Sequence, residues 1–236
     1  MQSCAQNSLS NPSRAALLDF DGTLGVTLPA WTDAFDAALR HHGVTLSHDE
    51  VIHAWFHACP DEFIRSHPIP DPGKFKELVW RNVMDRMNHV SPYPLMRETL
   101  QALSDAGYKI AVVTNSRRTA VEPVLARWQV EHLFDVIVSI DDVSHGKPDP
   151  QMIHHALNAL NISPSDAFIM GDSKSDVVAG KRAGVKTIAF SPEENRKYLA
   201  LEALRFTEPS HLIHSYDDLW EVLKIPPTPA SAGKTP

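Results

Sequence analysis

Cysteine is scarce in this chain, which has 2 cysteines among 236 residues. Cys4 and Cys59 lie far apart and match no metal-ligand spacing. The sequence therefore supplies neither a disulfide framework nor a cysteine-based metal site. We expect the protein to occupy a reducing compartment.

Long apolar runs are also missing. No uninterrupted apolar stretch approaches the ~20 residues of a membrane-spanning helix, and residues 1–13 lack the apolar core of a secretory signal. We expect a cytoplasmic protein that does not bind membranes, with organelle import open as an alternative because residues 1–14 are serine-rich and acid-free. Residues 1–13 and 225–236 are predicted to be disordered, since neither segment can bury enough apolar surface.

Positive charge is in deficit, with 22 Lys and Arg against 29 Asp and Glu and a formal net charge of -7. This balance repels the phosphate backbone of nucleic acids and argues against a nucleic-acid-binding module. Any phosphate site must therefore be positive locally.

What the chain does contain is an alternation of short apolar runs with helical patterns, typical of parallel strands joined by crossover helices. The strand candidates are residues 15–20, 109–114, 135–140, 166–170 and 185–190. Because these runs are almost continuously apolar, the strands should be covered on both faces. Helices are predicted at residues 95–106, 117–128, 150–160 and 174–183, with a kink or restart at Pro123. The sequence thus predicts an α/β core with a central parallel sheet in three layers, built from residues 14–24 and 93–224.

Residues 25–92 break this rhythm and read as three helices without a strand. The first begins near Pro29 and ends at Gly43. The second opens on Ser47 with Glu50 three residues later, which is the spacing of a capping box. The third carries an apolar face at helical spacing, made by Phe75, Leu78, Val79, Val83 and Met87. We predict a separate helical insert.

A pair of carboxylates follows the first strand, in Asp19-Phe20-Asp21-Gly22-Thr23-Leu24. The spacing of two residues puts both aspartates on one side of the pleat, so that one can attack an electrophile while the other handles protons. The alternative is a strand end with solvated aspartates and a turn glycine.

Two further segments suggest phosphate contacts. Thr114 and Asn115 end the second strand, where the Thr114 hydroxyl can donate to a phosphoryl oxygen; a simple N-cap is the alternative. Lys147 lies in His145-Gly146-Lys147-Pro148-Asp149-Pro150, where a fixed ammonium can neutralise a carboxylate and a transferring phosphoryl group. The alternative for Lys147 is an ordinary solvated lysine.

A fourth segment suggests a metal site. Gly171-Asp172-Ser173-Lys174-Ser175-Asp176 follows the fourth strand. Mg²⁺ prefers oxygen ligands and is commonly held by one or two carboxylates, which Asp19 and Asp172 can supply. The alternative is that Asp172 and Asp176 are acids that stabilise a helix N-terminus.

The Asp19–Leu24 segment resembles the first motif of the haloacid dehalogenase-like hydrolases, and the other three segments resemble that family's later motifs in the same order. The resemblance implies a Rossmann-like core, with Asp19 as nucleophile and Asp21 as general acid/base. It implies phosphate binding by Thr114, Asn115 and Lys147.

The same resemblance implies a Mg²⁺ cofactor held by Asp19, Asp172 and the backbone carbonyl of Asp21. It places Asp176 around these ligands, where it orients metal-bound water or occasionally binds the metal directly. The implied activity is hydrolysis of a small phosphorylated metabolite through an aspartyl-phosphate, as in capped phosphatases of the phosphoglycolate phosphatase type.

Residues 25–92 resemble the helical cap of such enzymes, although Gly25-Val26-Thr27 departs from the usual pattern at the hinge. Arg65, His67, Lys74 and Lys76 are candidates to contact substrate, with surface positions as the alternative. The sequence leaves open a phosphosugar mutase, a catalytically silent binding relative, and whether the protein is a monomer or a homodimer.

Overall fold

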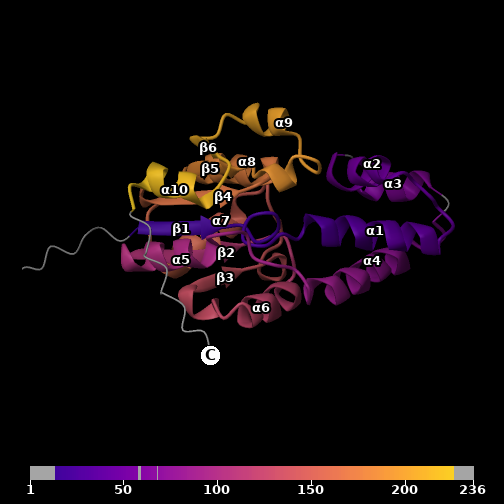
Figure 1. Cartoon of the computed structure of the whole chain (residues 1–236), viewed down its shortest axis with the longest axis horizontal. Helices are drawn as coiled ribbons and strands as arrows, with labels where there is room; N and C mark the ends of the chain where they lie inside the picture. Colours follow the sequence, from indigo (N-terminus) through magenta and orange to yellow (C-terminus); the bar gives the residue numbers. More distant parts are fainter. Residues whose placement is uncertain (1–13, 58–59, 68, 226–236) are drawn as a thin grey trace, which may run out of the picture.

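A six-stranded parallel sheet forms the centre of the protein in the computed structural model, which describes residues 14–57, 60–67 and 69–225. The strand order is β3-β2-β1-β4-β5-β6, and every neighbouring pair is parallel (Figure 1). The strands are β1 (Arg14–Leu18), β2 (Tyr108–Val113), β3 (Val136–Val138), β4 (Ala167–Gly171), β5 (Lys186–Phe190) and β6 (His211–Ile213).

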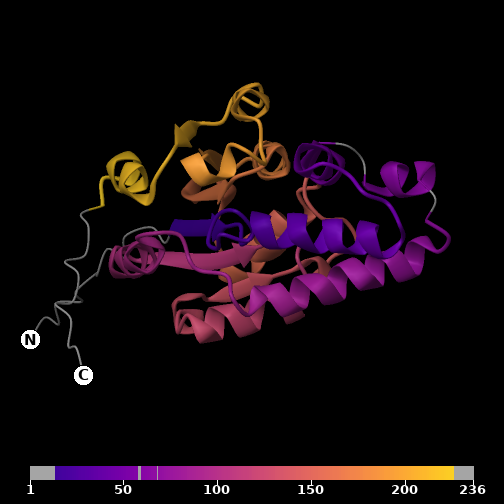
Figure 2. The same ribbon diagram turned by 45° about the vertical axis from the view of Figure 1, so that its right-hand side comes forward.

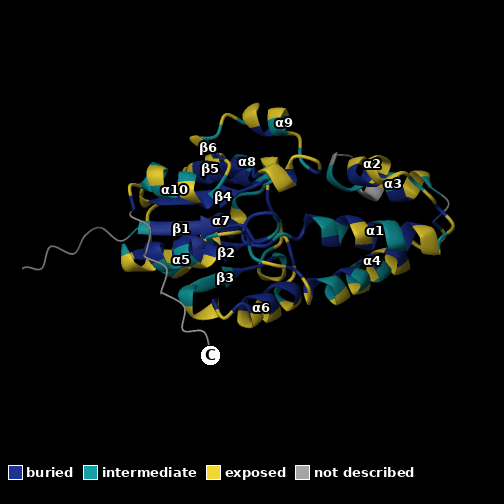
Figure 3. Ribbon diagram, in the orientation of Figure 1, coloured by how far each residue is buried: buried dark blue, intermediate teal, exposed yellow. Residues whose placement is uncertain are grey.

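The central strand β1 is buried on both faces, which explains its continuous apolar sequence. Ala16 and Leu18 belong to one apolar cluster, whereas Ala15 and Leu17 belong to the cluster on the opposite face. Successive side chains of a strand point to opposite faces, so the sheet lies between two helical layers (Figure 3). This confirms the predicted α/β Rossmann-like class.

The two layers use different helices. On one face, α7 (Gln151–Leu160) and α8 (Lys174–Ala183) pack against the sheet. On the other face lie α5 (Met96–Asp105), α6 (Arg118–Arg127) and α10 (Tyr216–Leu223). The short helix α9 (Leu201–Arg205) contributes Leu204 to a small cluster with α8.

The helical insert, residues 25–92, lies beyond the end toward which β1 points (Figures 1 and 2). Its elements are α1 (Leu28–His41), α2 (His48–Ile52), the π-helical turn η1 (His53–His57), α3 (Pro60–Ser66) and α4 (Pro72–Met87). The predicted capping box is present at α2, where the Glu50 carboxylate accepts the Ser47 N–H at 2.8 Å.

Aromatic rings hold the insert together. Phe35 is fully buried, and its ring centroid lies 4.9 Å from that of Trp55, 5.8 Å from Phe63 and 5.7 Å from Phe75. Such pairs stabilise beyond simple area burial. The apolar face of α4 that contains Phe75 is the one predicted from its helical spacing.

The insert differs from the prediction of three helices, because α3 is an additional helix. In the core, α6 continues through Pro123 without a restart, since its buried side chains hold it on the sheet. The predicted strand 135–140 ends at Val138, and Ile140 starts a 3-10 turn instead.

Two more expectations need revision at the C-terminal side. The strand β6 was missed because it has three residues, one of them an exposed histidine. Ile225, expected to begin a disordered tail, is 8% exposed and packs on the core. Residues 1–13 and 226–236, expected to be disordered, lie outside the described residues. No helix within the described ranges has both the length and the apolar character to span a bilayer.

The buried ring of Phe35 gives a stability prediction. Phe35→Ala should destabilise the protein by roughly 3–5 kcal/mol, the usual cost of deleting a buried phenyl group. Urea unfolding followed by tryptophan fluorescence measures this. Phe206→Ala is the matched control, because Phe206 is 85% exposed and should change stability by less than about 0.5 kcal/mol. Equal losses in both variants would contradict the aromatic core.

Candidate active site

The site lies at the carboxyl ends of three neighbouring strands. Asp19 follows β1, Thr114 follows β2 and Asp172 follows β4, and these strands are adjacent in the sheet. Strand order reverses between β1 and β4, and such a switch point is where open α/β sheets bind ligands.

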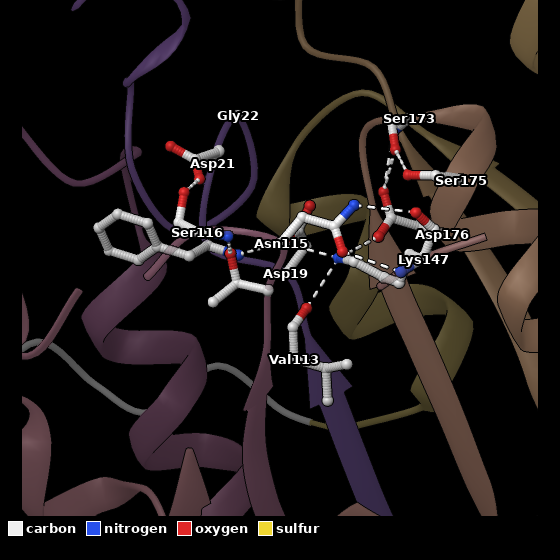
Figure 4. Close-up of polar contacts among 12 residues, drawn as sticks. Asp19, Asp21, Gly22, Val113, Asn115, Ser116, Lys147, Ser173, Ser175 and Asp176 are labelled. Carbon is white, nitrogen blue, oxygen red and sulfur yellow. Dashed lines mark hydrogen bonds and ion pairs between the residues drawn. The ribbon is translucent and has the colours of Figure 1, made fainter. Parts of the chain in front are cut away.

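Lys147 occupies the centre of this edge (Figure 4). Its ammonium lies 2.9 Å from Asp19 Oδ1, 2.5 Å from Asp176 Oδ1 and 2.7 Å from the carbonyl oxygen of Val113. The ammonium thus donates hydrogen bonds to Asp176 and Val113 and forms an ion pair with Asp19. The Lys147 side chain is 1% exposed, so its charge acts without much solvent screening.

Asp176 supports this lysine and also begins a helix. Its Oδ2 accepts hydrogen bonds from the Ser173 hydroxyl at 2.5 Å and from the Ser173 N–H at 3.1 Å, which completes the capping box of α8. Its other oxygen binds Lys147. Asp176 therefore has two roles: it caps the N-terminus of α8 and it binds Lys147 in the site.

Asn115 holds the loop that carries Lys147. Its Oδ1 accepts the Lys147 N–H at 2.8 Å, and its Nδ2 donates to the Lys147 carbonyl at 2.9 Å. Because both ends of the amide are used, the side chain clamps this loop. Direct phosphate binding by Asn115 stays a prediction.

Thr114 is fully buried, and its Oγ1 accepts the Ser116 N–H at 3.0 Å. This contact lies at the start of the connection from β2 to α6. Donation from the Thr114 hydroxyl to a phosphoryl oxygen stays a prediction.

Asp21 makes contacts of a different kind. Trp31 Nε1 of α1 donates to its Oδ1 at 2.7 Å, and the Ser116 hydroxyl donates to its Oδ2 at 2.5 Å. Figure 4 shows Asp21 and Ser116 beside the group formed by Lys147, Asp19 and Asp176. The insert thus contacts Asp21, the second aspartate of the Asp19–Leu24 segment, through Trp31.

Asp172 is fixed by a residue far away in the sequence. Asn195 Nδ2 donates to Asp172 Oδ2 at 3.1 Å and to the Gly22 carbonyl at 2.8 Å, while Tyr93 donates its hydroxyl to Asn195 Oδ1. Gly22 has φ +64°, and a Cβ there would lie 1.7 Å from Asp172 Oδ2. The turn after β1 therefore requires glycine both for its conformation and for space.

Negative charge exceeds positive charge inside the site. Burial, together with the neighbouring Asp176, raises the pKa of Asp19 to about 8 although Lys147 opposes this shift. Burial and then Asp19 raise the pKa of Asp172 well above its usual range. Burial disfavours the Lys147 ammonium, but Asp176 and Asp19 outweigh it and raise the pKa of the lysine.

This excess matches what a divalent cation needs. One carboxylate oxygen from each of Asp19, Asp172 and Asp176 can be chosen so that all three lie within 4.8 Å of one another. All three residues are buried, and carboxylate oxygens are the ligands that Mg²⁺ prefers. Asp19 and Asp172 of the predicted ligands therefore fit a metal together with Asp176, while ligation through the Asp21 carbonyl stays a prediction.

A cavity of about 400 Å³ opens above these groups. Its polar side is formed by the motif residues, including Asp19, Asp21, Thr114, Asn115, Lys147 and Asp172. Its other side is apolar and is formed by Leu28, Trp31, Trp55, Phe56 and Leu199. The candidates Arg65, His67, Lys74 and Lys76 do not line it.

Sequence reasoning missed Trp31, Tyr93 and Asn195 as site residues. Each lies on a segment that reaches the motif loops only in the folded chain, and none belongs to a pattern of its own. Ser116 directly follows Thr114-Asn115, and this position is the signal that could have identified it.

The role of the Lys147 charge can be tested through stability. Lys147→Met should cost roughly 3–5 kcal/mol in the presence of chelator, because it leaves buried carboxylates without a partner. Urea unfolding measures the loss. Lys181→Met is the control, since Lys181 is 45% exposed and lies 3.8 Å from Glu208, and such pairs contribute about 0–1 kcal/mol. A similar small loss in both variants would contradict this account.

Most of the chain matches one known protein family. Residues 16–190 match the haloacid dehalogenase-like hydrolases. The pyrophosphatase PpaX of Bacillus mycoides is 33% identical over 215 residues, which are 88% of this chain and 95% of that protein.

Solved structures agree on the fold. CbbY from Rhodobacter sphaeroides in complex with phosphate has a TM-score of 0.75 at 25% identity, covering 88% of this chain and 96% of that chain. A predicted phosphoglycolate phosphatase from Haemophilus somnus has a TM-score of 0.77 at 22% identity, covering 91% and 99%, and so shares the fold. The resemblance drawn from the motifs is confirmed, and the chain belongs to the haloacid dehalogenase-like hydrolase family of enzymes.

Proposed function

We propose that this protein hydrolyses a small phosphate monoester in a magnesium-dependent reaction that passes through an aspartyl-phosphate on Asp19. The observation that carries this proposal is the buried Lys147 ammonium, which lies 2.9 Å from Asp19 Oδ1 beside a cavity of about 400 Å³. A carboxylate nucleophile needs a neighbouring positive charge to accept a phosphoryl group, because both reactants are anionic.

In the first step, an Asp19 oxygen forms a bond to phosphorus as the ester P–O bond breaks. The departing alkoxide takes a proton from the Asp21 carboxyl group and leaves as an alcohol. Asp21 is positioned for this by Ser116, whose hydroxyl can either donate or accept, so a proton on the adjoining Asp21 oxygen is compatible with their 2.5 Å contact.

In the second step, a water oxygen attacks phosphorus and Asp21 accepts a proton from that water. The bond between Asp19 and phosphorus breaks, which returns the Asp19 carboxylate and releases inorganic phosphate. Asp21 thus recovers the proton it gave up, and both aspartates end in their starting states.

The chain's own residues hold the phosphoryl group and the metal. Lys147 neutralises phosphoryl oxygens, and the Thr114 hydroxyl donates to one of them. Asp19, Asp172 and the Asp21 carbonyl would hold the Mg²⁺, with Asp176 orienting Lys147 and the surrounding groups. When bound, the ion keeps the carboxylates ionised and offsets negative charge on the phosphoryl group.

The helical insert serves as the cap in this proposal, because four of its residues, Leu28, Trp31, Trp55 and Phe56, line the cavity. Such a lid excludes water from the reacting phosphate. A phosphosugar mutase would use the same two aspartates but return the phosphate to a sugar. Stoichiometric release of inorganic phosphate separates the phosphatase from the mutase.

The two aspartates can be separated by phosphoenzyme trapping. With ³²P-labelled p-nitrophenyl phosphate, whose leaving group needs no proton, Asp19→Asn should give no turnover and no labelled protein. Asp21→Asn should slow turnover roughly 10²–10⁴-fold, the usual contribution of acid–base catalysis, and should accumulate label. Asp105→Asn, which changes an exposed aspartate, is the control. Labelling of Asp19→Asn at the wild-type level would refute the nucleophile.

The metal site predicts different effects of two cations. Mg²⁺ should support activity, whereas Ca²⁺ should inhibit it, because calcium tolerates bidentate carboxylates and can engage the attacking oxygen of Asp19. Asp172→Asn should raise the Mg²⁺ concentration for half-maximal activity at least about tenfold.

Thermal unfolding gives a readout of this site that does not depend on activity. Mg²⁺ should raise the Tm of the wild type, by linkage to the folded state, and should leave the Tm of Asp172→Asn almost unchanged. Full activity in excess chelator would refute the metal requirement.

A further inference from the structure

The cavity is lined by two chemically different groups of side chains. The motif residues are charged or polar, and the others are apolar. Five side chains that form the opposite side are apolar: Leu28, Trp31, Trp55, Phe56 and Leu199. Among the described residues that line the cavity, Lys147 is the one with a positive charge. That ammonium lies beside Asp19 and Asp176, and the proposed reaction assigns it to the transferred phosphoryl group.

The apolar side is a surface and not simply part of the insert's core. Phe35 and Phe75, which form that core, are fully buried. Trp31, Trp55 and Phe56 are instead partly exposed and line the cavity. The Trp31 and Trp55 rings stack with centroids 5.6 Å apart at an interplanar angle of 17°, and both residues line the cavity.

Two neighbouring cations do not line the cavity. Lys174 lines an adjoining pocket that shares Phe56 and Leu199 with it. The Arg117 guanidinium lies 4.8 Å from the centroid of the Trp80 ring, on a residue that does not line the cavity. A second anionic group on the substrate would therefore meet aromatic and aliphatic carbon without a charge partner. Burying an unpaired charge in this way is strongly unfavourable.

We infer, on the basis of the proposed phosphatase activity, that the preferred substrates are phosphate monoesters whose leaving group is a small apolar alcohol, aromatic or aliphatic, without a second anionic group. The phosphoryl group lies against Asp19 and Lys147, and the apolar part contacts the Trp31–Trp55 pair. The chain thereby differs in substrate class from its pyrophosphatase relative, whose named substrate is anionic at both ends.

The volume agrees with a ligand of this size. Pockets for small molecules occupy roughly 300–1,000 Å³, and this cavity of about 400 Å³ lies near the lower limit. Apolar contact in such a pocket discriminates between substrates by roughly 10–200-fold per methylene group.

The test compares four probes on the wild-type protein with Mg²⁺ by release of inorganic phosphate. Phosphoglycolate carries a carboxylate where ethyl phosphate has a methyl group. Benzyl phosphate carries an aromatic ring at that position, and pyrophosphate is anionic at both ends. We expect kcat/KM to be highest for benzyl phosphate and at least about tenfold lower for phosphoglycolate and pyrophosphate than for ethyl phosphate.

Two variants localise the preference. Trp55→Ala should lower kcat/KM for benzyl phosphate at least about tenfold while changing that for ethyl phosphate much less. Leu199→Lys adds a cation at a partly exposed position of the lining and should raise the ratio of phosphoglycolate to ethyl phosphate turnover. If Trp55→Ala fails to fold, Leu199→Lys still tests whether the apolar lining excludes a second anionic group.

The outcomes separate this inference from the proposed function. Release of phosphate from none of the three monoesters would refute the phosphatase activity itself. Turnover of phosphoglycolate or pyrophosphate as fast as ethyl phosphate would leave the activity standing and overturn the apolar substrate class. Loss of phosphoglycolate turnover in Arg117→Gln would likewise overturn it, because Arg117 would then be the partner of a second anion.

Discussion

The buried Lys147 ammonium has three partners, two that accept its hydrogen bonds and one that forms an ion pair with it, and the site is arranged around these contacts. The acceptors come from the loop after β1, the end of β2 and the start of α8, so one cation fixes three elements relative to each other. A charge buried this deeply is tolerated only when it is paired and hydrogen-bonded. The loop that presents Lys147 is in turn held by Asn115, which binds both the N–H and the carbonyl group of Lys147. Moving any of these elements would leave a buried charge without its partner.

The same buried cluster of charges fits a divalent cation. Lys147 supplies one positive charge to a cluster that contains Asp19, Asp172 and Asp176. Burial, and after it the neighbouring carboxylates, raises the pKa of Asp19 and of Asp172. Asp172 nevertheless keeps a fixed position, because Asn195 ties it to the turn at Gly22. The carboxylates are thus preorganised by neutral hydrogen bonds rather than by the cation that would neutralise them. Preorganisation of this kind lets charged groups act without reorganising during the reaction.

Most of the core and the polar residues at the carboxyl edge of the sheet could be predicted from the sequence, because both depend on local order along the chain. Apolar runs mark buried strands, and side chains that follow parallel strands meet at one edge, which places Asp19, Thr114 and Asp172 together. Other contacts in the site cannot be recognised from a local sequence pattern. Asn195 reaches Gly22 across 173 positions in the sequence, and Trp31 reaches Asp21 only because α1 folds back over the site. The strand β6 and the helix α3 are too short for a periodic pattern, so tertiary packing decides them.

Asp21 joins the two chemically different sides of the cavity. Its carboxylate is held on one oxygen by Ser116 from the core and on the other by Trp31 from the insert. Trp31 belongs to the aromatic pair that forms the apolar surface, so a leaving group that contacts this pair also contacts the residue that positions the proposed proton donor. Binding energy from the non-reacting part of a substrate can then be used to orient the group that acts on its oxygen. In this arrangement, the fit of an apolar leaving group and the delivery of its proton depend on the same tryptophan.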